Sequence, residues 1–428
     1  AMRNDGRAGE QRYNEEDLAL YRSGQDPWGH PNVDWVGQSL KNVTVGQKYN
    51  LSIEGGSSVA KYFVNLSYRS EEGIYKTDKD INTYKTNANA KIYSLRSNVD
   101  IALTKSMDLS INLFGLQRQL SNPGAGSPFS AIYSLPSNAF PMYYDRNKVA
   151  GTNDLRNNPY GILNHSGYTR YTHSTMEAQA ELGQKLDFIT KGLSVQGKVS
   201  LSTYYKYTTL RTEYDRPAWY LDFSKIGTDE NAWRRTGDNG YLYVPNPVYT
   251  TAGNALQDGY YLDLYYDISL NYNRTFGRHN VTGLVLFNRQ EQDKGSDFPY
   301  YNEAIVARAT YDFAHKYLVE VNMGYTGSER FAPGNRFGFF PSGAVGWVVS
   351  EERFFEPLKP WFSKLKLRYS QGLVGSDYAN NRWLYMSEFS KDSNGNIVED
   401  KIANSSVQWE QAMKRDLGIE MSFLRDEL

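Results

Sequence analysis

The segment Tyr317-Leu318-Val319-Glu320-Val321-Asn322-Met323-Gly324-Tyr325 alternates between apolar and polar side chains. Successive side chains of a β-strand point to opposite faces, so the odd-numbered residues share an apolar face, and the even-numbered ones, apart from Leu318, share a polar face. Tyrosine stands at both ends of the apolar face. Eight steps of about 3.3 Å, tilted by about 40°, span roughly 20 Å, close to the roughly 25 Å apolar band of strands that cross a membrane. The segment therefore predicts a strand between lipid and water.

The same alternation recurs along the chain from Tyr49 to Phe423. Counting segments that fit the strand period gives about 13 strands, with turn residues between them. Other clear examples are Leu193–Tyr207, Leu262–Tyr272, Ile305–Tyr311 and Leu365–Tyr369. We therefore expect one large antiparallel sheet rather than several small domains.

The predicted connections between strands fall into two classes that take turns along the chain. Short turns on one rim and long loops on the other are typical of an outer-membrane β-barrel, with the turns in the periplasm and the loops outside. The pattern predicts an all-β fold, an antiparallel transmembrane outer-membrane β-barrel. The short turns lie near Ser57, Lys105, Lys191, Arg278 and His315, and the longest loops span roughly 121–170, 210–257 and 377–404.

Composition excludes several classes of protein. The net charge of -1 gives no reason to expect a nucleic-acid partner, and the lack of cysteine excludes a disulfide scaffold and a thiolate metal site. Mean hydropathy is -0.64, and no apolar run reaches the ~18 residues of a membrane-spanning helix, which a barrel wall does not need. The 35 tyrosines suit an interface between lipid and water, and abundant aromatics also suit carbohydrate binding.

Signals for an enzyme, a metal site or a cofactor are weak. The histidines form no H-E-x-x-H motif, and Gly124–Pro128 lacks the lysine of a phosphate loop. The stretch Asp392–Asn396 has its glycine misplaced for a calcium loop, so Asn394-Gly395 predicts a hairpin turn. Three acidic residues follow the strand alternation, which favours a wet lumen lining over a glycosidase pair. These carboxylates are Asp263, Asp267 and Asp312.

Aromatic residues on the long loops are the candidates for ligand binding. Beside Asp, Asn and Arg, exposed rings suit recognition of sugars or peptides, because ring faces give contact area and polar groups give orientation. Packing large loops against each other needs the same residues, so both roles stay open. The candidates are Tyr143, Tyr144, Trp219, Tyr220, Trp233, Tyr241, Tyr243 and Trp383.

Short motifs follow one another from about residue 30 to 424. They are Asn32-Val33-Asp34-Trp35, Tyr49–Ser57 with Lys61-Tyr62-Phe63 and Glu72-Gly73-Ile74, Arg96–Asp100, Asn158-Pro159-Tyr160, Asn335–Ser342 with Gly346-Trp347 and Ser350-Glu351-Glu352, Leu365–Ser370, and Val407–Glu410. Each motif is short, but together and in this order they resemble the SusC/RagA family of TonB-dependent outer-membrane transporters of Bacteroidetes.

The resemblance implies a barrel of about 22 strands, of which this chain supplies about 13. A signal sequence, a TonB box and a plug domain are expected upstream, and further strands downstream. Residues 1–46 are then an irregular extracellular loop region leading into the barrel, and residues 47–428 are the barrel segment. The family imports glycan or peptide oligomers across the outer membrane of Gram-negative bacteria, energised by the TonB–ExbB–ExbD complex and assisted by a SusD-like lipoprotein.

Two alternatives stay open. Within membrane proteins, the chain fits a passive porin or a siderophore-type receptor. From another class, it fits a soluble all-β polysaccharide-binding module or enzyme. In the soluble alternative Val199, Leu270 and Val321 pack into a dry interior, whereas in a barrel they face hydrocarbon.

Overall fold

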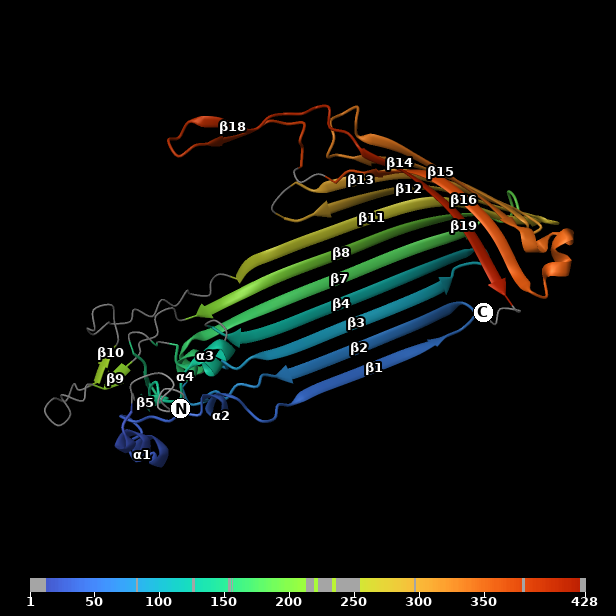
Figure 1. Cartoon of the computed structure of the whole chain (residues 1–428). Helices are drawn as coiled ribbons and strands as arrows, with labels where there is room; N and C mark the ends of the chain where they lie inside the picture. The colour runs from blue at the N-terminus through green and yellow to red at the C-terminus, as the bar shows by residue number, and fades with distance from the viewer. Residues whose placement is uncertain are drawn as a thin grey trace.

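The computed structural model describes residues 13–81, 84–124, 128–152, 155, 157–212, 219–221, 233–235, 255–295, 298–378 and 382–423. Within these residues 13 strands form one antiparallel sheet, which curves along its width (Figure 1). The sequence predicts about 13 strands in one antiparallel sheet, and their order in the sheet follows the chain. The strands are β1 (Gly46–Gly56), β2 (Ala60–Glu72), β3 (Asn89–Ala102), β4 (Met107–Pro123), β7 (Gly167–Lys185), β8 (Leu193–Thr212), β11 (Ala255–Phe276), β12 (His279–Asp293), β13 (Tyr300–Phe313), β14 (Tyr317–Ser328), β15 (Phe337–Val348), β16 (Phe362–Ser376) and β19 (Glu410–Phe423).

The remaining described elements are short and lie in the connections. Within the described residues, three small two-stranded sheets stand apart from the main sheet. They are β5 (Tyr143–Asp145) with β6 (Lys148–Val149), β9 (Trp219–Leu221) with β10 (Trp233–Arg235), and β17 (Glu388–Lys391) with β18 (Ile397–Lys401). The helices are α1 (Glu15–Ser23), α2 (Trp35–Ser39), α3 (Pro128–Ser134) and α4 (Pro159–His165), with the 3-10 turns η2 (Val349–Glu351) and η3 (Arg353–Leu358). None of the described helices is long and apolar enough to cross a membrane.

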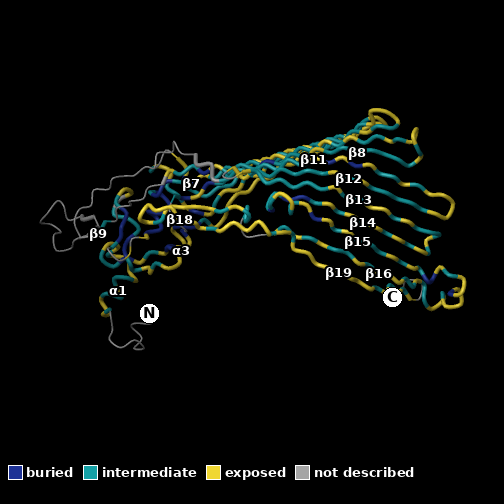
Figure 2. The backbone as a smooth tube through the Cα atoms, turned by 90° about the horizontal axis from the view of Figure 1, so that it is seen from above, coloured by how far each residue is buried: buried dark blue, intermediate teal, exposed yellow. Residues whose placement is uncertain are grey.

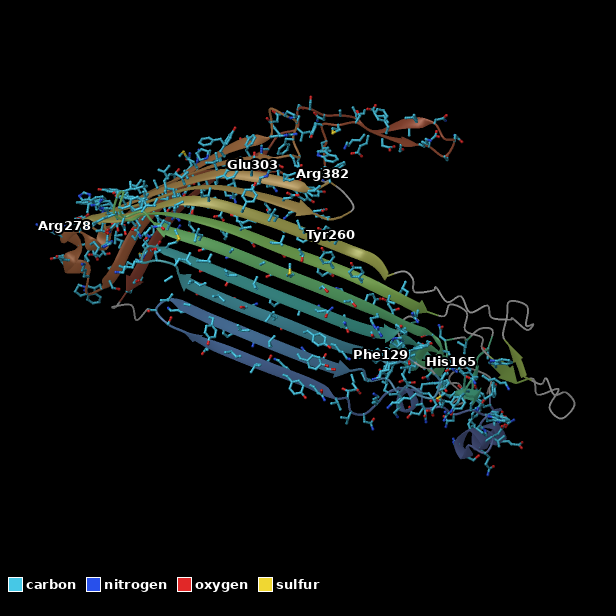
Figure 3. The ribbon with its side chains drawn as sticks, turned by 180° about the vertical axis from the view of Figure 1, so that it is seen from behind. Phe129, His165, Tyr260, Arg278, Glu303 and Arg382 are labelled. Atoms are coloured by element: carbon cyan, nitrogen blue, oxygen red, sulfur yellow. The ribbon has the colours of Figure 1, made fainter. Side chains whose placement is uncertain are left out.

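The connections are sorted onto two rims, which confirms the predicted alternation of short turns and long loops. One rim carries the two-residue connection 277–278 and the three-residue connections 57–59 and 314–316. The opposite rim carries the long connections 124–166, 213–254 and 377–409, and we call it the loop rim. Figure 3 shows Arg278 at the turn rim, with His165 and Arg382 at the loop rim. One turn-rim connection, between β15 and β16, was not anticipated and holds η2 and η3.

The two faces of the sheet differ in the way that the alternation predicts. On β14, Tyr317, Val319, Val321, Met323 and Tyr325 share one side and are each 42–47% exposed. We call this side the apolar face and the opposite side the polar face. The soluble alternative places three residues in a dry interior, but all three are half-exposed on the apolar face. The exposed fractions are 52% for Val199, 46% for Leu270 and 47% for Val321. This exposure is contrary to the packed interior that the soluble alternative requires.

Aromatic rings gather at both ends of the apolar face. Near the loop rim, Tyr49 stacks on Tyr68 at a centroid distance of 6.2 Å, and Tyr68 contacts Tyr93 at 5.0 Å. At the turn rim, the Phe313 ring lies 6.4 Å from Tyr317. The two ends of the β14 segment therefore join separate aromatic rows, as is typical of strands that meet two lipid–water interfaces. Other ring pairs are Tyr205–Tyr260 and Tyr325–Phe337 near the loop rim and Phe362–Phe423 at the turn rim.

Two turn-rim glycines provide a matched test of the backbone geometry. Gly192 has φ +86° and Gly277 has φ +62°, but a Cβ on Gly192 would lie 2.0 Å from the carbonyl oxygen of Asn273, whereas one on Gly277 would meet open space. We expect Gly277→Ala to lower the free energy of unfolding by about 1 kcal/mol through the left-handed backbone alone. Gly192→Ala should cost about 3 kcal/mol, because the clash adds to this strain. Denaturant titration of the refolded protein measures both, and equal losses would contradict the geometry.

Candidate functional site

The described loops of the loop rim pack into a small core of their own. It joins parts of residues 13–45, 73–88 and 124–166, which we call the loop assembly. Figure 2 shows buried stretches gathered at this end of the sheet. Because apolar burial is the main source of folding free energy, this core fixes the loops relative to one another. Its buried members are Trp35, Leu40, Tyr75, Ile132, Phe140, Ala150 and Leu163.

A buried asparagine ties the loop assembly together. The Asn158 side chain is the N-cap of α4, and its Oδ1 accepts a hydrogen bond from the Tyr160 backbone N–H at 2.9 Å. Its Nδ2 donates to the backbone carbonyls of Met142 and Ala150, each at 2.8 Å. Pro159 follows at the first helical position, where its missing N–H is harmless. The Asn158 side-chain amide thus fixes the start of α4 and two segments of the loop that precedes it.

Three of the eight predicted ligand-binding aromatics lie in the loop assembly or against it. The Tyr143 ring lies 4.7 Å from the Tyr160 ring, and Tyr144 packs against the buried core. The Trp219 carbonyl accepts a hydrogen bond from the Gly151 N–H at 2.9 Å, and the Lys148 ammonium lies 5.9 Å from its ring. All three side chains are half-buried. Their observed contacts are therefore those of loop packing, the second of the two predicted roles.

The other predicted aromatics fall into two groups. Tyr220 on β9 and Trp233 on β10 are placed by backbone pairing alone, and their side chains lie outside the described residues, as do Tyr241 and Tyr243 entirely. Trp383 belongs to the connection 377–409 and contacts Phe298 with a ring-centroid distance of 5.6 Å. Its backbone has φ +52°, which is uncommon for a residue other than glycine. Trp383 therefore helps to build a second site next to the β12–β13 connection.

Arg382 is the centre of this second site, and no sequence motif points to it. Its side chain is 8% exposed and pairs with the Glu329 carboxylate. The guanidinium also donates to the backbone carbonyls of Phe298 and Pro299. Its Cζ lies 4.0 Å from the Tyr300 ring centroid and 4.2 Å from that of Trp383, within the range of cation–π attraction. The bonded partners lie 53 to 84 residues away along the chain, beyond any local pattern.

Acidic residues of the polar face are engaged across strands. Asp267 pairs with Lys198 at 3.1 Å, and both Asp263 carboxylate oxygens accept from the Gln290 side chain. Asp312 instead belongs to the turn rim, where it accepts a hydrogen bond from the His315 backbone N–H at 2.7 Å. Among the described residues, no three His, Asp or Glu side chains gather as a metal site. The cross-strand pairs fit a polar wall.

The stretch at Asp392 forms the predicted hairpin turn. Asp392 Oδ1 accepts hydrogen bonds from the backbone N–H groups of Asn394 and Asn396, at 2.9 and 2.8 Å. Gly395 takes φ +82° between β17 and β18, a conformation that glycine adopts without strain. The carboxylate therefore closes the turn.

Comparison with known proteins identifies relatives along nearly the whole chain. TonB-dependent receptor P3 of Formosa agariphila is 22% identical over 467 aligned residues, covering 96% of this chain and 42% of that protein. TonB-dependent receptor SusC of Bacteroides thetaiotaomicron is 23% identical, covering 94% of this chain and 41% of SusC. No family model matches the chain. Among solved structures, the RagAB peptide importer in its open-open state superposes with a TM-score of 0.59 at 16% identity, covering 96% of this chain and 46% of that one.

The resemblance to the SusC/RagA family is confirmed. The fold is that of TonB-dependent outer-membrane barrels, and the chain spans less than half the length of the SusC/RagA-type relatives that it matches. These relatives carry the names of receptors and of a peptide importer, in agreement with the expectation that the chain is not an enzyme.

The motifs that carried the SusC/RagA resemblance have structural roles at both rims. Asp34 is the N-cap of α2 and accepts a hydrogen bond from the Gly37 N–H, and Trp35 is buried with its indole N–H donating to the Pro136 carbonyl at 3.0 Å. At the turn rim, Glu352 accepts from the Tyr317 hydroxyl at 2.7 Å and from the Lys316 ammonium at 3.0 Å. These motifs therefore hold the loops and the turn-rim aromatics in place.

His165 makes the loop assembly sensitive to acid. Burial lowers the pKa of His165 below its ordinary value, although its ring nitrogen lies 2.9 Å from the Arg146 carbonyl oxygen and Asp78 opposes the shift. The unfolded chain binds a proton near pH 6.5 and the folded chain only at lower pH. Stability from the neutral ring is thus complete above pH 6.5, and is lost as pH falls through the folded pKa.

We expect amide protection in residues 158–166 to decrease between pH 7 and pH 5, measured by hydrogen exchange and corrected for intrinsic rates. His165→Gln should remove most of this dependence. The helix α4 is the right reporter because His30, beside α1, has the opposite pH dependence. A hydrogen bond from the His30 ring to the Asp26 carboxylate raises the pKa of His30. Protection in α4 that stays constant with pH would contradict the prediction.

Proposed function

We propose that the chain is part of an outer-membrane transporter that imports glycan or peptide oligomers in the manner of SusC. Uptake is energised by TonB through the TonB–ExbB–ExbD complex, and a SusD-like surface lipoprotein covers the loop rim. The observation that carries the proposal is the alignment of 92–96% of the chain with proteins named TonB-dependent receptors. The sheet supports it, because one face is apolar and exposed while the other carries cross-strand ion pairs.

In this proposal the apolar face contacts the lipid of the outer membrane of a Gram-negative bacterium, and the polar face lines the transport path. Residues 1–46 form an extracellular region leading into the barrel wall, and residues 47–428 belong to the wall and its loops. The substrate meets aromatic side chains on the loop rim. Trp383 is the best placed of them, because it is half-buried beside Phe298, which is 70% exposed. The two neighbouring rings, tilted by 56° to each other, give apolar contact area of the kind that sugars and peptides contact.

An uptake assay tests the proposal. Cells that express the intact transporter are given fluorescent oligosaccharides or oligopeptides, with TonB present or deleted. We expect uptake of one class only, lost without TonB and reduced when Trp383→Ala removes the ring. Phe389→Ala is the matched control, because Phe389 is 64% exposed on β17 outside this ring pair.

The outcomes separate the alternatives. Uptake that persists without TonB would support a passive porin. Uptake restricted to ferric chelates would support a siderophore-type receptor. Recovery of the protein in the soluble fraction without detergent would support a polysaccharide-binding module or enzyme, and would refute the proposed transporter.

A further inference from the structure

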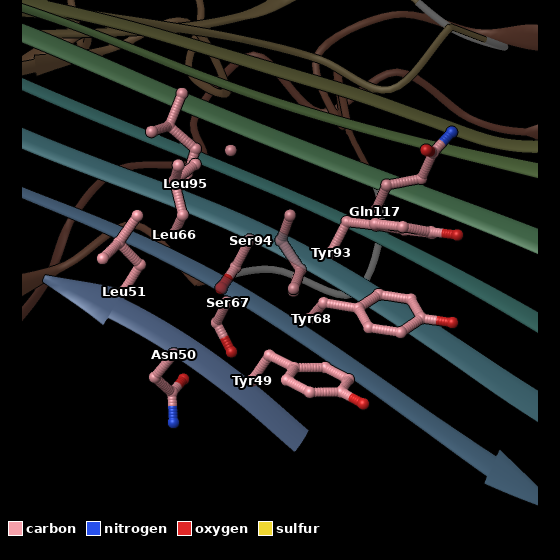
Figure 4. Close-up of a pocket in the computed structure, with 12 residues that line it drawn as sticks. Tyr49, Asn50, Leu51, Leu66, Ser67, Tyr68, Tyr93, Ser94, Leu95 and Gln117 are labelled. Carbon is pink, nitrogen blue, oxygen red and sulfur yellow. The ribbon is translucent and has the colours of Figure 1, made fainter. Parts of the chain in front are cut away.

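A shallow dent interrupts the apolar face across β1 to β4. Its volume is about 580 Å³, and its lining is almost entirely apolar. Three tyrosines line the side toward the loop rim, and three leucines line the side toward the turn rim (Figure 4). The tyrosine hydroxyls all lie at the same end of the dent. The lining includes Tyr49, Tyr68, Tyr93, Leu51, Leu66 and Leu95.

The dent exists because Gly115 has no side chain. In the strand register Gly115 lies between Leu95 on β3 and Met176 on β7, so large apolar side chains stand on both sides of it. A Cβ added to Gly115 would meet no atom within 4 Å. The sheet therefore leaves this hollow open where a larger residue would fit without strain.

A lysine lies beyond the end of the dent that is nearer the loop rim. Lys91 is exposed on the same face as Tyr93 and two residues nearer the loop rim, which places it about 7 Å farther along the strand. Its neighbours across the ladder are Ser70 and Gln119. Lys91 takes part in none of the ion pairs found among the described residues. The carboxylate of Glu72, which lies opposite Asn89 and two residue pairs nearer the loop rim, pairs with Lys41 at 3.8 Å. A positive charge thus lies next to the loop-rim end of the apolar dent.

We propose that the dent holds an acyl chain of lipid A, the phosphorylated glycolipid of lipopolysaccharide, with a phosphate of its headgroup bound by Lys91. The inference rests on the proposed function, which places the loop rim at the outer leaflet. Three features match the parts of this lipid at successive depths in the membrane. The leucines surround the acyl chain, the tyrosine hydroxyls lie at the lipid–water interface, and the Lys91 ammonium lies at the level of the headgroup. The charge favours a phosphorylated lipid over a neutral one.

The test measures how much lipid stays bound. The intact protein, reconstituted into phosphatidylcholine nanodiscs with trace lipid A, is transferred to detergent, and retained lipid is counted by native mass spectrometry. We expect retention of lipid A to exceed that of dephosphorylated lipid A about fivefold, and Lys91→Gln to abolish this difference. Gly115→Leu should lower retention of both lipids about tenfold, because the added side chain fills the dent.

Two control variants make the result specific. Gly283→Leu adds the same side chain elsewhere on the apolar face, where a Cβ would lie 3.8 Å from Tyr272, and Lys48→Gln removes a charge from the polar face of β1. Both should retain lipid A as the unmodified protein does. Equal retention by Gly115→Leu and the unmodified protein would overturn the proposal, as would an equal loss in Gly283→Leu. Failure of the proposed function would be seen before lipid retention is measured, because the protein would then stay soluble without detergent.

Discussion

Val199→Arg is expected to lower the free energy of unfolding in a lipid bilayer by about 2–4 kcal/mol, the penalty for arginine at the midplane of an outer-membrane strand. Val199 lies on β8 midway between Leu193 and Tyr205, is 52% exposed on the apolar face, and pairs in register with Ala180 and Tyr266. In lipid its exposed surface contacts hydrocarbon, and the guanidinium would have to leave water. In a soluble protein the same half-exposed position would accept arginine with little change, since surface substitutions alter stability by about 0.5 kcal/mol or less.

Ser200→Arg is the matched control, because it adds the same side chain one residue along β8 and on the polar face. Its cross-strand neighbours are Gln179 and Tyr265, both of which tolerate an adjacent cation. Guanidinium titration of the protein refolded into phosphatidylcholine vesicles measures both variants. We expect Ser200→Arg to be nearly neutral, and Val321→Arg at the middle of β14 to repeat the loss seen at Val199. Equal effects at positions 199 and 200 would mean that the two faces meet the same solvent.

Arg382→Ala is expected to release the base of the connection 377–409 from the β12–β13 and β14–β15 connections. The substitution leaves the Glu329 carboxylate, 20% exposed, without its cation, and removes the donor to two backbone carbonyls. Removing one partner of a buried ion pair costs about 3 kcal/mol or more. Hydrogen-exchange protection around residues 298–301 should therefore decrease roughly a hundredfold. The β17–β18 hairpin should also become sensitive to protease.

Two further variants show which property of Arg382 matters. Arg382→Lys keeps the charge but loses the planar fork, so we expect it to recover only part of the protection. Lys391→Ala removes an exposed cation from the end of β17 and should have no effect on residues 298–301. A double substitution of Arg382 and Glu329 should cost less than the sum of the single ones. Full protection in Arg382→Ala would show that the ring contacts alone hold the connection.

The strand alternation determined the sheet. Tyr317 to Tyr325 reads as an exposed strand because side chains flip at each residue, and the structure places its apolar residues together on one exposed face. The same local rule predicted about 13 strands in one antiparallel sheet, and the main sheet contains 13. The hairpin turn at Asn394-Gly395 could also be predicted from the sequence, because glycine adopts a positive φ without strain.

Only the tertiary structure determined which contacts each loop residue makes. Tyr143 and Trp383 look equivalent in sequence, yet Tyr143 packs against Tyr160, and Trp383 lies on Arg382 beside an exposed ring. Gly115 is one of 36 glycines, and only its neighbours in the register reveal a hollow. Alternation is a local property of the backbone, so one chain segment suffices to show it. Contacts between distant loops depend on which segments the strand ladder brings together, and no single segment carries that information.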